Sequence, residues 1–272
     1  MRRELPEPVW SILLTSAQSI DRLDAEVLLA HHLGCTRMEM LLHPARLVET
    51  GGLATLMARR MRGEPVAHIT GHREFWSLDL VVTPAVLIPR PDSETLIEAA
   101  ADHFRDRAPP RTILDLGTGS GALLLAALTE WPGARGVGID ASEAALAVAR
   151  RNAQRLGLRE RASFGIGDWH GNGTAHDLIL CNPPYVATTE TLPPGVLNWE
   201  PHASLFAGAS GLDDYRRIAP RLAAQMNDGG VACIEIGATQ AAVVAALFHQ
   251  AGLMTALRRD LAGLPRCIVV TK

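Results

Sequence analysis

The tetrapeptide Asn182-Pro183-Pro184-Tyr185 carries the strongest chemical signal in the chain. Two consecutive prolines lock φ and remove N–H donors, so this loop is stiff and its carbonyls can only accept hydrogen bonds. The Asn182 side-chain oxygen and the Pro183 carbonyl can accept the two N–H bonds of a primary amide, while the Tyr185 ring packs against its flat face. We predict that Asn182, Pro183 and Tyr185 are catalytic and that all four residues contact the substrate, because holding the nitrogen in line with an activated methyl group supplies most of the acceleration. The alternative is that this tetrapeptide is an ordinary turn without a chemical role, since Asn-Pro and Pro-Pro are common in loops.

A glycine loop, DLGTGSG (115–121), lies where a hydrophobic segment passes into a helix. Glycines permit tight turns and let a ligand lie against the backbone, and the end of a strand is where open α/β sheets bind cofactors. The pattern G-x-G-x-x-A fits a dinucleotide site as well, with Asp140 about twenty residues further on. Asp115 favours S-adenosylmethionine, because a carboxylate would attract its cationic amino end and repel a pyrophosphate. Asp140 can hold the ribose hydroxyls in either case. The predicted cofactor contacts of this region are Asp115, Gly117, Thr118, Gly119, Ser120, Gly121 and Asp140.

A further pair, Asp168-Trp169, follows a third strand. Asp168 could read the exocyclic amine of adenine, and Trp169 could cover its ring. The alternative interpretation is a loop carboxylate and an aromatic side chain at the rim of the sheet, and the pair alone does not decide between them.

From Arg111 onward, strand and helix patterns alternate. Strands are predicted at 112–116, 135–140, 162–166, 176–181, 231–237 and 267–271, and helices at 120–130, 142–156, 212–226 and 238–251. The last strand can be antiparallel to the others. This alternation predicts an α/β fold with a mostly parallel sheet and helices on both faces. All the predicted site residues then lie at one edge of the sheet.

The first seventy residues have a different sequence pattern, with apolar positions at helical spacing. Asp21 is predicted to cap a helix that ends at Gly34, and a further amphipathic helix covers 53–62. Residues 71–91 combine an aromatic, β-branched run with prolines, which indicates a β-hairpin linker. Asp92 or Ser93 can cap the next helix, 94–107. We therefore expect a helical domain over 1–70, a linker over 71–91 and an α/β domain over 92–272.

Composition excludes several classes of protein. The chain of 272 residues contains a single lysine, Lys272, so neither a P-loop nor a Schiff-base enzyme has its required amine. Four dispersed cysteines predict neither a disulfide framework nor a metal site. The net charge of −3 is near neutral, and the helical region carries equal numbers of arginines and acidic residues, so no phosphate-binding surface is indicated. Without a membrane span or a signal sequence, we expect a cytoplasmic protein.

Together these motifs resemble the peptide chain release factor glutamine methyltransferases, also called the PrmC/HemK family. The resemblance runs through GEPVAHITGHREFWSLDL, LIPRPDSE, ILDLGTGSGAL, GIDASEAAL, GDW, CNPPY, EPHASLFAGASGLDDYRRI and DLAGLPR. It implies a class I S-adenosylmethionine methyltransferase fold, Rossmann-like with a mostly parallel seven-stranded sheet. It also implies cofactor contacts from residues 117–121, Asp140, Trp169 and Asn182, and a helical N-terminal domain that docks the release factor. The implied substrate is the glutamine of the Gly-Gly-Gln motif. One departure is Ala67-His68, where the family usually has Ala-Tyr.

Several alternatives stay open at this stage. A methyltransferase acting on an exocyclic amine of a nucleic acid base uses a similar loop, but it must flip the base and grip phosphates. A methyltransferase of a ribosomal-protein glutamine is the nearer competitor, although PRPDSE favours release factors. A nicotinamide oxidoreductase leaves the Asn-Pro-Pro-Tyr loop without a role. An inactive binding module is disfavoured because every expected contact residue is present.

Overall fold

The computed structural model describes residues 6–272, which divide into two compact units. One contains the chain up to His72 together with Leu192–Trp199. The other contains Arg73–Thr191 and Glu200–Lys272. The return of residues 192–199 to the N-terminal unit is a feature that the sequence patterns did not predict.

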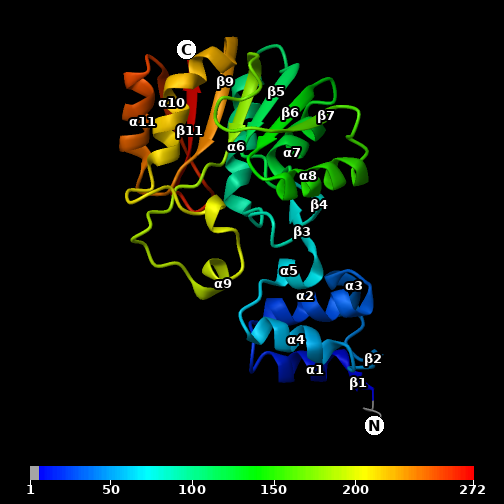
Figure 1. Cartoon of the computed structure of the whole chain (residues 1–272). Helices are drawn as coiled ribbons and strands as arrows, with labels where there is room; N and C mark the ends of the chain where they lie inside the picture. Colours follow the sequence, from blue (N-terminus) through cyan, green and yellow to red (C-terminus); the bar gives the residue numbers. More distant parts are fainter. Residues whose placement is uncertain (1–5) are drawn as a thin grey trace. The chain divides into compact units, whose positions relative to one another are not determined.

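The N-terminal unit is built of short helices around a small apolar core. Asp21 accepts a hydrogen bond from the Leu23 N–H at 2.8 Å and so caps α2, and Gly34 ends that helix with a φ of +63°, which confirms both predicted boundaries. The core includes Val9, Leu29 and Met40. The elements, visible in Figure 1, are β1 (Glu7–Pro8), α1 (Val9–Ser16), α2 (Arg22–Leu33), α3 (Arg37–Leu42), β2 (Leu47–Val48), α4 (Leu53–Met61) and α5 (Val66–Thr70).

A β-hairpin follows, formed by β3 (His72–Phe75) and β4 (Leu78–Val81). Its two turn residues, Trp76 and Ser77, both have positive φ, at 51° and 61°. This is the backbone geometry that matches a two-residue turn to the twist of its strands. The structure therefore has a hairpin within the stretch where aromatic and β-branched residues predicted one.

The larger unit contains a seven-stranded sheet in the order β10-β11-β9-β8-β5-β6-β7. The pairs among β7, β6, β5, β8 and β9 are parallel, whereas β11 is antiparallel to both of its neighbours. The predicted antiparallel last strand is thus confirmed, and β10 is an edge strand that no pattern indicated. The strands are β5 (Thr112–Leu116), β6 (Arg135–Asp140), β7 (Ala162–Ile166), β8 (His176–Cys181), β9 (Met226–Glu235), β10 (Met254–Arg259) and β11 (Pro265–Thr271).

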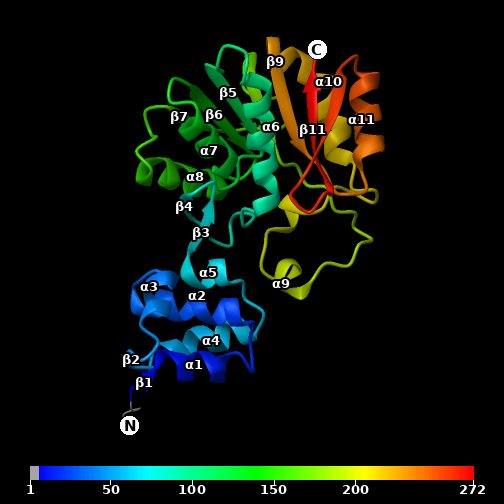
Figure 2. The ribbon, with the colours of Figure 1, turned by 180° about the vertical axis from the view of Figure 1, so that it is seen from behind.

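Helices cover both faces of this sheet (Figures 1 and 2). Alternate strand residues point to opposite faces, so Leu178 and Leu180 join one buried core while Ile179 and Cys181 join the other. The first core is completed by α6 (Glu94–Phe104), α7 (Ala122–Glu130) and α8 (Glu143–Arg155), and the second by α10 (Asp213–Gln225) and α11 (Ala241–Gln250). The remaining helical turns are Pro91–Ser93, α9 (Pro194–Leu197) and His202–Ser204. Among the described residues, no helix has the length and apolar character that crossing a membrane requires.

Candidate active site

A cavity of about 490 Å³ opens at the carboxyl ends of the parallel strands. The register pairs Leu116 with Ile139 and with Cys181, so the segments that follow β5, β6 and β8 emerge side by side. This cavity is lined by residues 117–120 of the glycine loop and by Asp140, Asp168, Trp169, Asn182 and Pro184, whereas Gly121 is not among its lining residues. The sheet therefore brings together predicted residues that lie up to 67 positions apart in the chain, from residue 117 to residue 184.

The glycine loop forms one wall of the cavity. The N–H groups of Gly117 and Thr118 donate to the Ile139 carbonyl at 2.8 and 3.0 Å, which ties the loop to the end of β6. At Gly119 φ is +54°, and a Cβ there would meet no protein atom closer than 4.0 Å. A side chain at that position would be strained and would project into open space beside the loop. The loop is shaped for a ligand that lies close to its backbone.

Two carboxylates flank this loop in different ways. Asp140, the last residue of β6, accepts from the Gly119 N–H and the Ser142 N–H, each at 2.9 Å, and it lines the cavity. Asp115 is only 1% exposed, and its carboxylate accepts from the Thr118 hydroxyl at 2.6 Å from beneath the loop. Asp115 does not belong to the cavity lining, so its contact with a cofactor stays a prediction.

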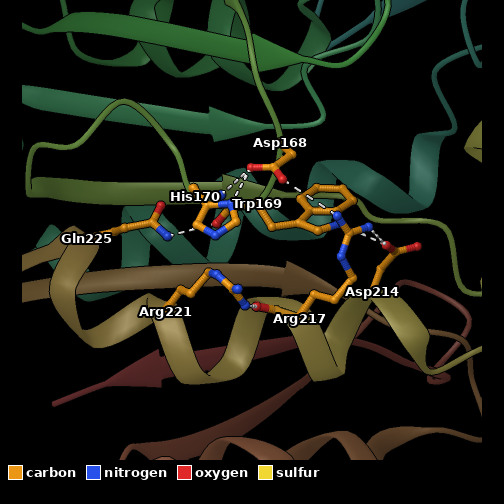
Figure 3. Close-up of polar contacts among 7 residues, drawn as sticks. All are labelled: Asp168, Trp169, His170, Asp214, Arg217, Arg221 and Gln225. Carbon is orange, nitrogen blue, oxygen red and sulfur yellow. Dashed lines mark hydrogen bonds and ion pairs between the residues drawn. The ribbon is translucent and has the colours of Figure 1, made fainter.

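A second wall of the cavity, which adjoins the glycine loop, is built by Asp168-Trp169 and α10 (Figure 3). The Trp169 indole N–H donates to the Asp214 carboxylate at 2.7 Å, and the Trp169 carbonyl accepts from Gln225 at 3.0 Å. The ring lies so close to Gly117 that a Cβ there would approach it to 3.3 Å. Arg217 bridges the two carboxylates, at 3.2 Å from Asp214 and 3.6 Å from Asp168. Trp169 is thereby held with its ring against Gly117 of the glycine loop.

The Asn182-Pro183-Pro184-Tyr185 loop is held by partners outside the motif. The Asn182 Nδ2 donates to the Ser93 hydroxyl at 3.2 Å. The Tyr185 hydroxyl donates to Glu235 at 3.3 Å, and the Tyr185 carbonyl accepts from Gln240 at 2.9 Å. Asn182 and Pro184 face the cavity, whereas Pro183 and Tyr185 are not among its lining residues.

Residues outside the predicted set complete the site. Asp92 or Ser93 was expected to cap α6. The structure has Ser93 at the N-cap position without a side-chain capping bond, which corrects that expectation. The Ser93 hydroxyl instead donates to Glu235 at 2.5 Å. Asp214 and Arg217 line the cavity from α10. Glu235 ends β9 in the same row as the other functional residues, so its position at a strand end was the signal that could have identified it.

Two charged residues near the cavity, Arg90 and Glu94, have structural partners. Arg90 pairs with Glu200, and Glu200 also accepts from the Ile88 N–H at 3.0 Å. Glu94 accepts from the Trp76 N–H at 2.8 Å, at the hairpin turn. Neither Arg90 nor Glu94 lines the cavity, so both brace the chain around it.

Two buried carboxyl groups have strongly altered acidity. Burial raises the pKa of Asp115 to about 7, against the opposing effect of hydrogen bonds from Thr118 and the Leu124 backbone. Burial likewise raises the pKa of Glu235 to about 7, although the Ser93 hydrogen bond and the nearby Arg266 charge act to lower it. Both groups therefore keep their protons to a higher pH than exposed carboxyl groups do.

The lining suits a cationic ligand that lacks phosphate. Within the described chain, its charged residues are three carboxylates, Asp140, Asp168 and Asp214, and one guanidinium, Arg217, which two of those carboxylates already engage. A pyrophosphate requires donors and positive charge, whereas S-adenosylmethionine carries a sulfonium and an ammonium. The open space at Gly119 and the aromatic ring of Trp169 in the cavity lining are also compatible with an adenosyl group. The residues therefore fit S-adenosylmethionine better than a dinucleotide.

We expect Trp169→Ala to weaken S-adenosylmethionine binding about tenfold or more, because stacking of a base on an aromatic ring is worth about 1–3 kcal/mol. Isothermal titration of the purified protein measures this affinity. Trp10→Ala is the matched control, since Trp10 is 53% exposed on α1. Equal affinity of the Trp169 variant and the wild type would show that this ring only closes the edge of the sheet.

Comparisons with known proteins agree with this geometry. Residues 10–71 match the model of the PrmC N-terminal domain, and residues 109–252 match that of a methyltransferase domain. The chain is 40% identical to the release factor glutamine methyltransferase of Rhodospirillum rubrum over 99% of this chain and 84% of that protein. It is 41% identical to the protein of the same name from Xylella fastidiosa strain Temecula1, over 97% of this chain and 98% of that protein.

Solved structures share the fold at low sequence identity. A methyltransferase from Pyrococcus furiosus covers 80% of this chain, with 97% of its own length, at 16% identity and a TM-score of 0.53. The hMettl16 catalytic domain, solved with the MAT2A 3′UTR hairpin 6, covers 83% of this chain, with 84% of its own length, at 16% identity and a TM-score of 0.57. These likenesses concern the fold alone.

The sheet order, the glycine loop at its centre and the matched domain model define a class I S-adenosylmethionine-dependent methyltransferase. Identities of about 40% over nearly the whole chain then specify the branch. The chain belongs to the release factor glutamine methyltransferase family.

Proposed function

We propose that this enzyme transfers a methyl group from S-adenosylmethionine to the side-chain amide nitrogen, N5, of the glutamine in the Gly-Gly-Gln motif of peptide chain release factors. The names of its relatives support this substrate. The observation that carries the proposal is the anchoring of Asn182 at the cavity wall. Because Nδ2 and Oδ1 are the two branches of one planar amide, fixing Nδ2 on Ser93 directs Oδ1 away from Ser93 as a hydrogen-bond acceptor.

Each residue of the loop has a proposed role in holding the substrate amide. The Asn182 Oδ1 and the Pro183 carbonyl accept its two N–H bonds, which orients the nitrogen lone pair. Pro184 lines the cavity beside them, and Tyr185, fixed by Glu235 and Gln240, supports the loop and packs against the amide plane. The cofactor supplies a methyl group already activated by positive sulfur, so the proposal includes neither a metal ion nor a histidine base. Positioning supplies the remaining rate enhancement.

We further propose which residues hold the cofactor. Asp140 faces the ribose hydroxyls, the 117–121 loop supplies backbone contacts, and Asp168 and Trp169 surround the adenine. Asn182 borders the reacting centre from the other side. Asp115 supports the loop through Thr118 and adds negative charge beneath it. The lining carboxylates support this arrangement because they complement a cationic ligand.

The proposed partner is a class 1 release factor, which docks through the helical domain of residues 1–70 and acts in the cytoplasm. We propose no stable binding of nucleic acid and no membrane attachment. The balanced charge of the helical region supports the first point, because binding to nucleic acid relies on neutralising phosphates. A ribosomal-protein glutamine is the second candidate substrate.

The test supplies labelled S-adenosylmethionine with one acceptor at a time. The acceptors are a bacterial release factor, the same factor with the motif glutamine changed to alanine, a ribosomal protein fraction and duplex DNA. Label confined to the unmodified factor is the expected result. Label found only on a ribosomal protein, or only on DNA, would show that the proposed substrate is wrong. The assignment to the methyltransferases would still stand.

A further inference from the structure

A buried chain of hydrogen bonds links Asn182 to a carboxylate outside the Asn-Pro-Pro-Tyr motif. Asn182 Nδ2 donates to the Ser93 hydroxyl at 3.2 Å, and that hydroxyl donates to Glu235 at 2.5 Å. The second carboxylate oxygen of Glu235 accepts from the Tyr185 hydroxyl at 3.3 Å. Ser93 and Glu235 are 4% and 1% exposed. One buried side chain thus holds both ends of the loop.

The direction of these bonds determines which face Asn182 presents to the cavity. An ionised carboxylate only accepts hydrogen bonds, so the Ser93 proton must point toward Glu235. The Ser93 oxygen is then available to accept from Asn182 Nδ2. That bond turns the side-chain oxygen of Asn182 away from Ser93, which is the orientation that a substrate N–H needs.

We propose that Glu235, acting through Ser93, is a positioning residue that sets the orientation of the Asn182 side chain for methyl transfer. This inference rests on the proposed function, because it concerns the orientation of the same amide. It adds two residues, one on β9 and one before α6, that neither belong to the motif nor touch the reacting atoms. Glu235 is itself fixed from the other side, since its backbone carbonyl accepts from the Tyr215 hydroxyl at 2.8 Å.

Protonation of Glu235 reverses the chain of bonds. A protonated carboxyl donates to the Ser93 oxygen, and the Ser93 hydroxyl proton becomes available to the oxygen of Asn182. The Asn182 amide can then rotate so that its N–H groups face the N–H groups of the substrate amide. Two donors cannot form a hydrogen bond with each other, so the substrate amide is no longer held. The expected rate constant kcat therefore falls as the pH drops through about 7, where Glu235 takes up its proton. Several titratable and charged groups surround Glu235. They are Tyr185 in the Asn-Pro-Pro-Tyr loop, Tyr215 on α10, Cys181 on β8, Arg266 and Cys267 on β11, and Asp92 before α6.

The first experiment compares kcat of the full chain with a release factor at saturating S-adenosylmethionine between pH 6 and 8.5. We expect Ser93→Ala to lower kcat about 10- to 100-fold, in line with the cost of misplacing a catalytic group. We expect its S-adenosylmethionine affinity to stay within about twofold, because the glycine loop and the cavity carboxylates are intact. Ser93→Thr keeps the hydroxyl and is expected to retain most of the activity. Equal loss in both variants would mean that packing at Ser93, and not its hydrogen bond, matters.

Two further variants separate positioning from a structural role. Glu235→Gln cannot titrate, so the inflection of kcat near pH 7 is expected to disappear. Tyr185→Phe removes only the second bond to Glu235 and is expected to have a smaller effect than Ser93→Ala. A wild-type pH profile in Glu235→Gln or in Ser93→Ala would overturn the proposal. If the buried glutamine prevents folding, Ser93→Ala and Tyr185→Phe still decide the question.

A second measurement needs no acceptor substrate. In ¹⁵N NMR spectra, the Asn182 side-chain NH₂ signal, assigned with Asn182→Ala, is expected to shift with pH around 7 in the wild type and not in Ser93→Ala. A signal without this titration refutes the positioning inference even if the release factor is methylated. A titrating signal together with no methylation refutes the proposed substrate and leaves the inference in place.

Discussion

Asn182→Ala is expected to lower kcat for release-factor methylation about 100- to 1000-fold, the range seen when a hydrogen-bonding group that stabilises the reacting centre is lost. The amide of the substrate is a poor nucleophile, and the alanine variant lacks the Asn182 oxygen, which is one of the two proposed acceptors for its N–H groups. The loss is expected mainly in kcat, because the cavity residues that we propose as the cofactor site, the glycine loop, Asp140 and Trp169, remain in place. Single-turnover transfer from labelled S-adenosylmethionine measures it directly.

Asn172→Ala serves as the matched control for this variant. Asn172 is exposed in the loop between β7 and β8, where it bonds Thr174 and His176 away from the cavity. It is expected to methylate the factor at the wild-type rate. Should Asn182→Ala also retain the wild-type kcat, the amide would be held by other groups and the role of the loop would have to be reassigned.

The strand-end rule explains why so much of the site could be predicted from the sequence. Parallel strands present their carboxyl ends at one edge, so Asp140, Asp168 and Asn182 were placed together without knowledge of the fold. The same rule applies to Glu235, at the end of a strand that was predicted. It was missed because a single glutamate after a buried strand has no distinguishing motif around it.

Ser93 shows a different limit of local patterns. Before a helix, a serine is ordinarily a cap, and nothing within a few residues indicates that its hydroxyl is used elsewhere. Its partner Glu235 lies 142 positions away. The Ser93 hydroxyl can bond either the backbone at the start of its helix or the distant, buried carboxylate of Glu235. Tertiary structure decides between these two partners. The expected side-chain cap at Ser93 was therefore wrong, although the helix begins at Glu94 as predicted.

Two features of the fold were not predictable for related reasons. Strand β10 is an edge strand whose residues are mostly exposed, so it lacks the apolar alternation that reveals a half-buried strand. The segment 192–199 joins the N-terminal unit through tertiary contacts, such as the close approach of Gly195 to the Gly63 carbonyl, where a Cβ would lie at 3.4 Å. Neither has a signature within a short window of sequence.

Asp115→Asn is expected to stabilise the cofactor-free protein increasingly as the pH rises. Burial raises the pKa of Asp115 in the folded state to about 7, against an ordinary value of 3.8 for an exposed carboxyl group. Between these two values the folded protein binds a proton that the unfolded chain has released, so stability falls with rising pH until the group ionises near pH 7. Asparagine has no such proton to lose. From pH 5 to pH 7 the span is two pH units, each worth about 1.4 kcal/mol, so the advantage of the variant should grow by about 3 kcal/mol between pH 5 and pH 8.

Asp177→Asn is the contrasting control on the same sheet. Burial acts to raise the pKa of Asp177, but hydrogen bonds from Asn227, from the Arg111 and Thr112 backbones and from the Thr112 hydroxyl prevail and lower it. Its stabilising contribution is therefore present above the unfolded pKa and is lost only as the pH falls through the still lower folded pKa. We expect Asp177→Asn to be destabilising by the same amount at pH 5 and at pH 8.

Urea unfolding of the three proteins at pH 5, 6, 7 and 8 measures both effects. Parallel stability curves for the wild type and Asp115→Asn would mean that Asp115 is already ionised in the fold at pH 5. An ionised Asp115 costs the folded protein stability at neutral pH. Its negative charge would attract a cationic ligand that binds above the glycine loop. We therefore expect Asp115→Asn to bind S-adenosylmethionine more weakly than the wild type at pH 8. The difference should shrink below pH 7, where the wild-type carboxyl is itself neutral.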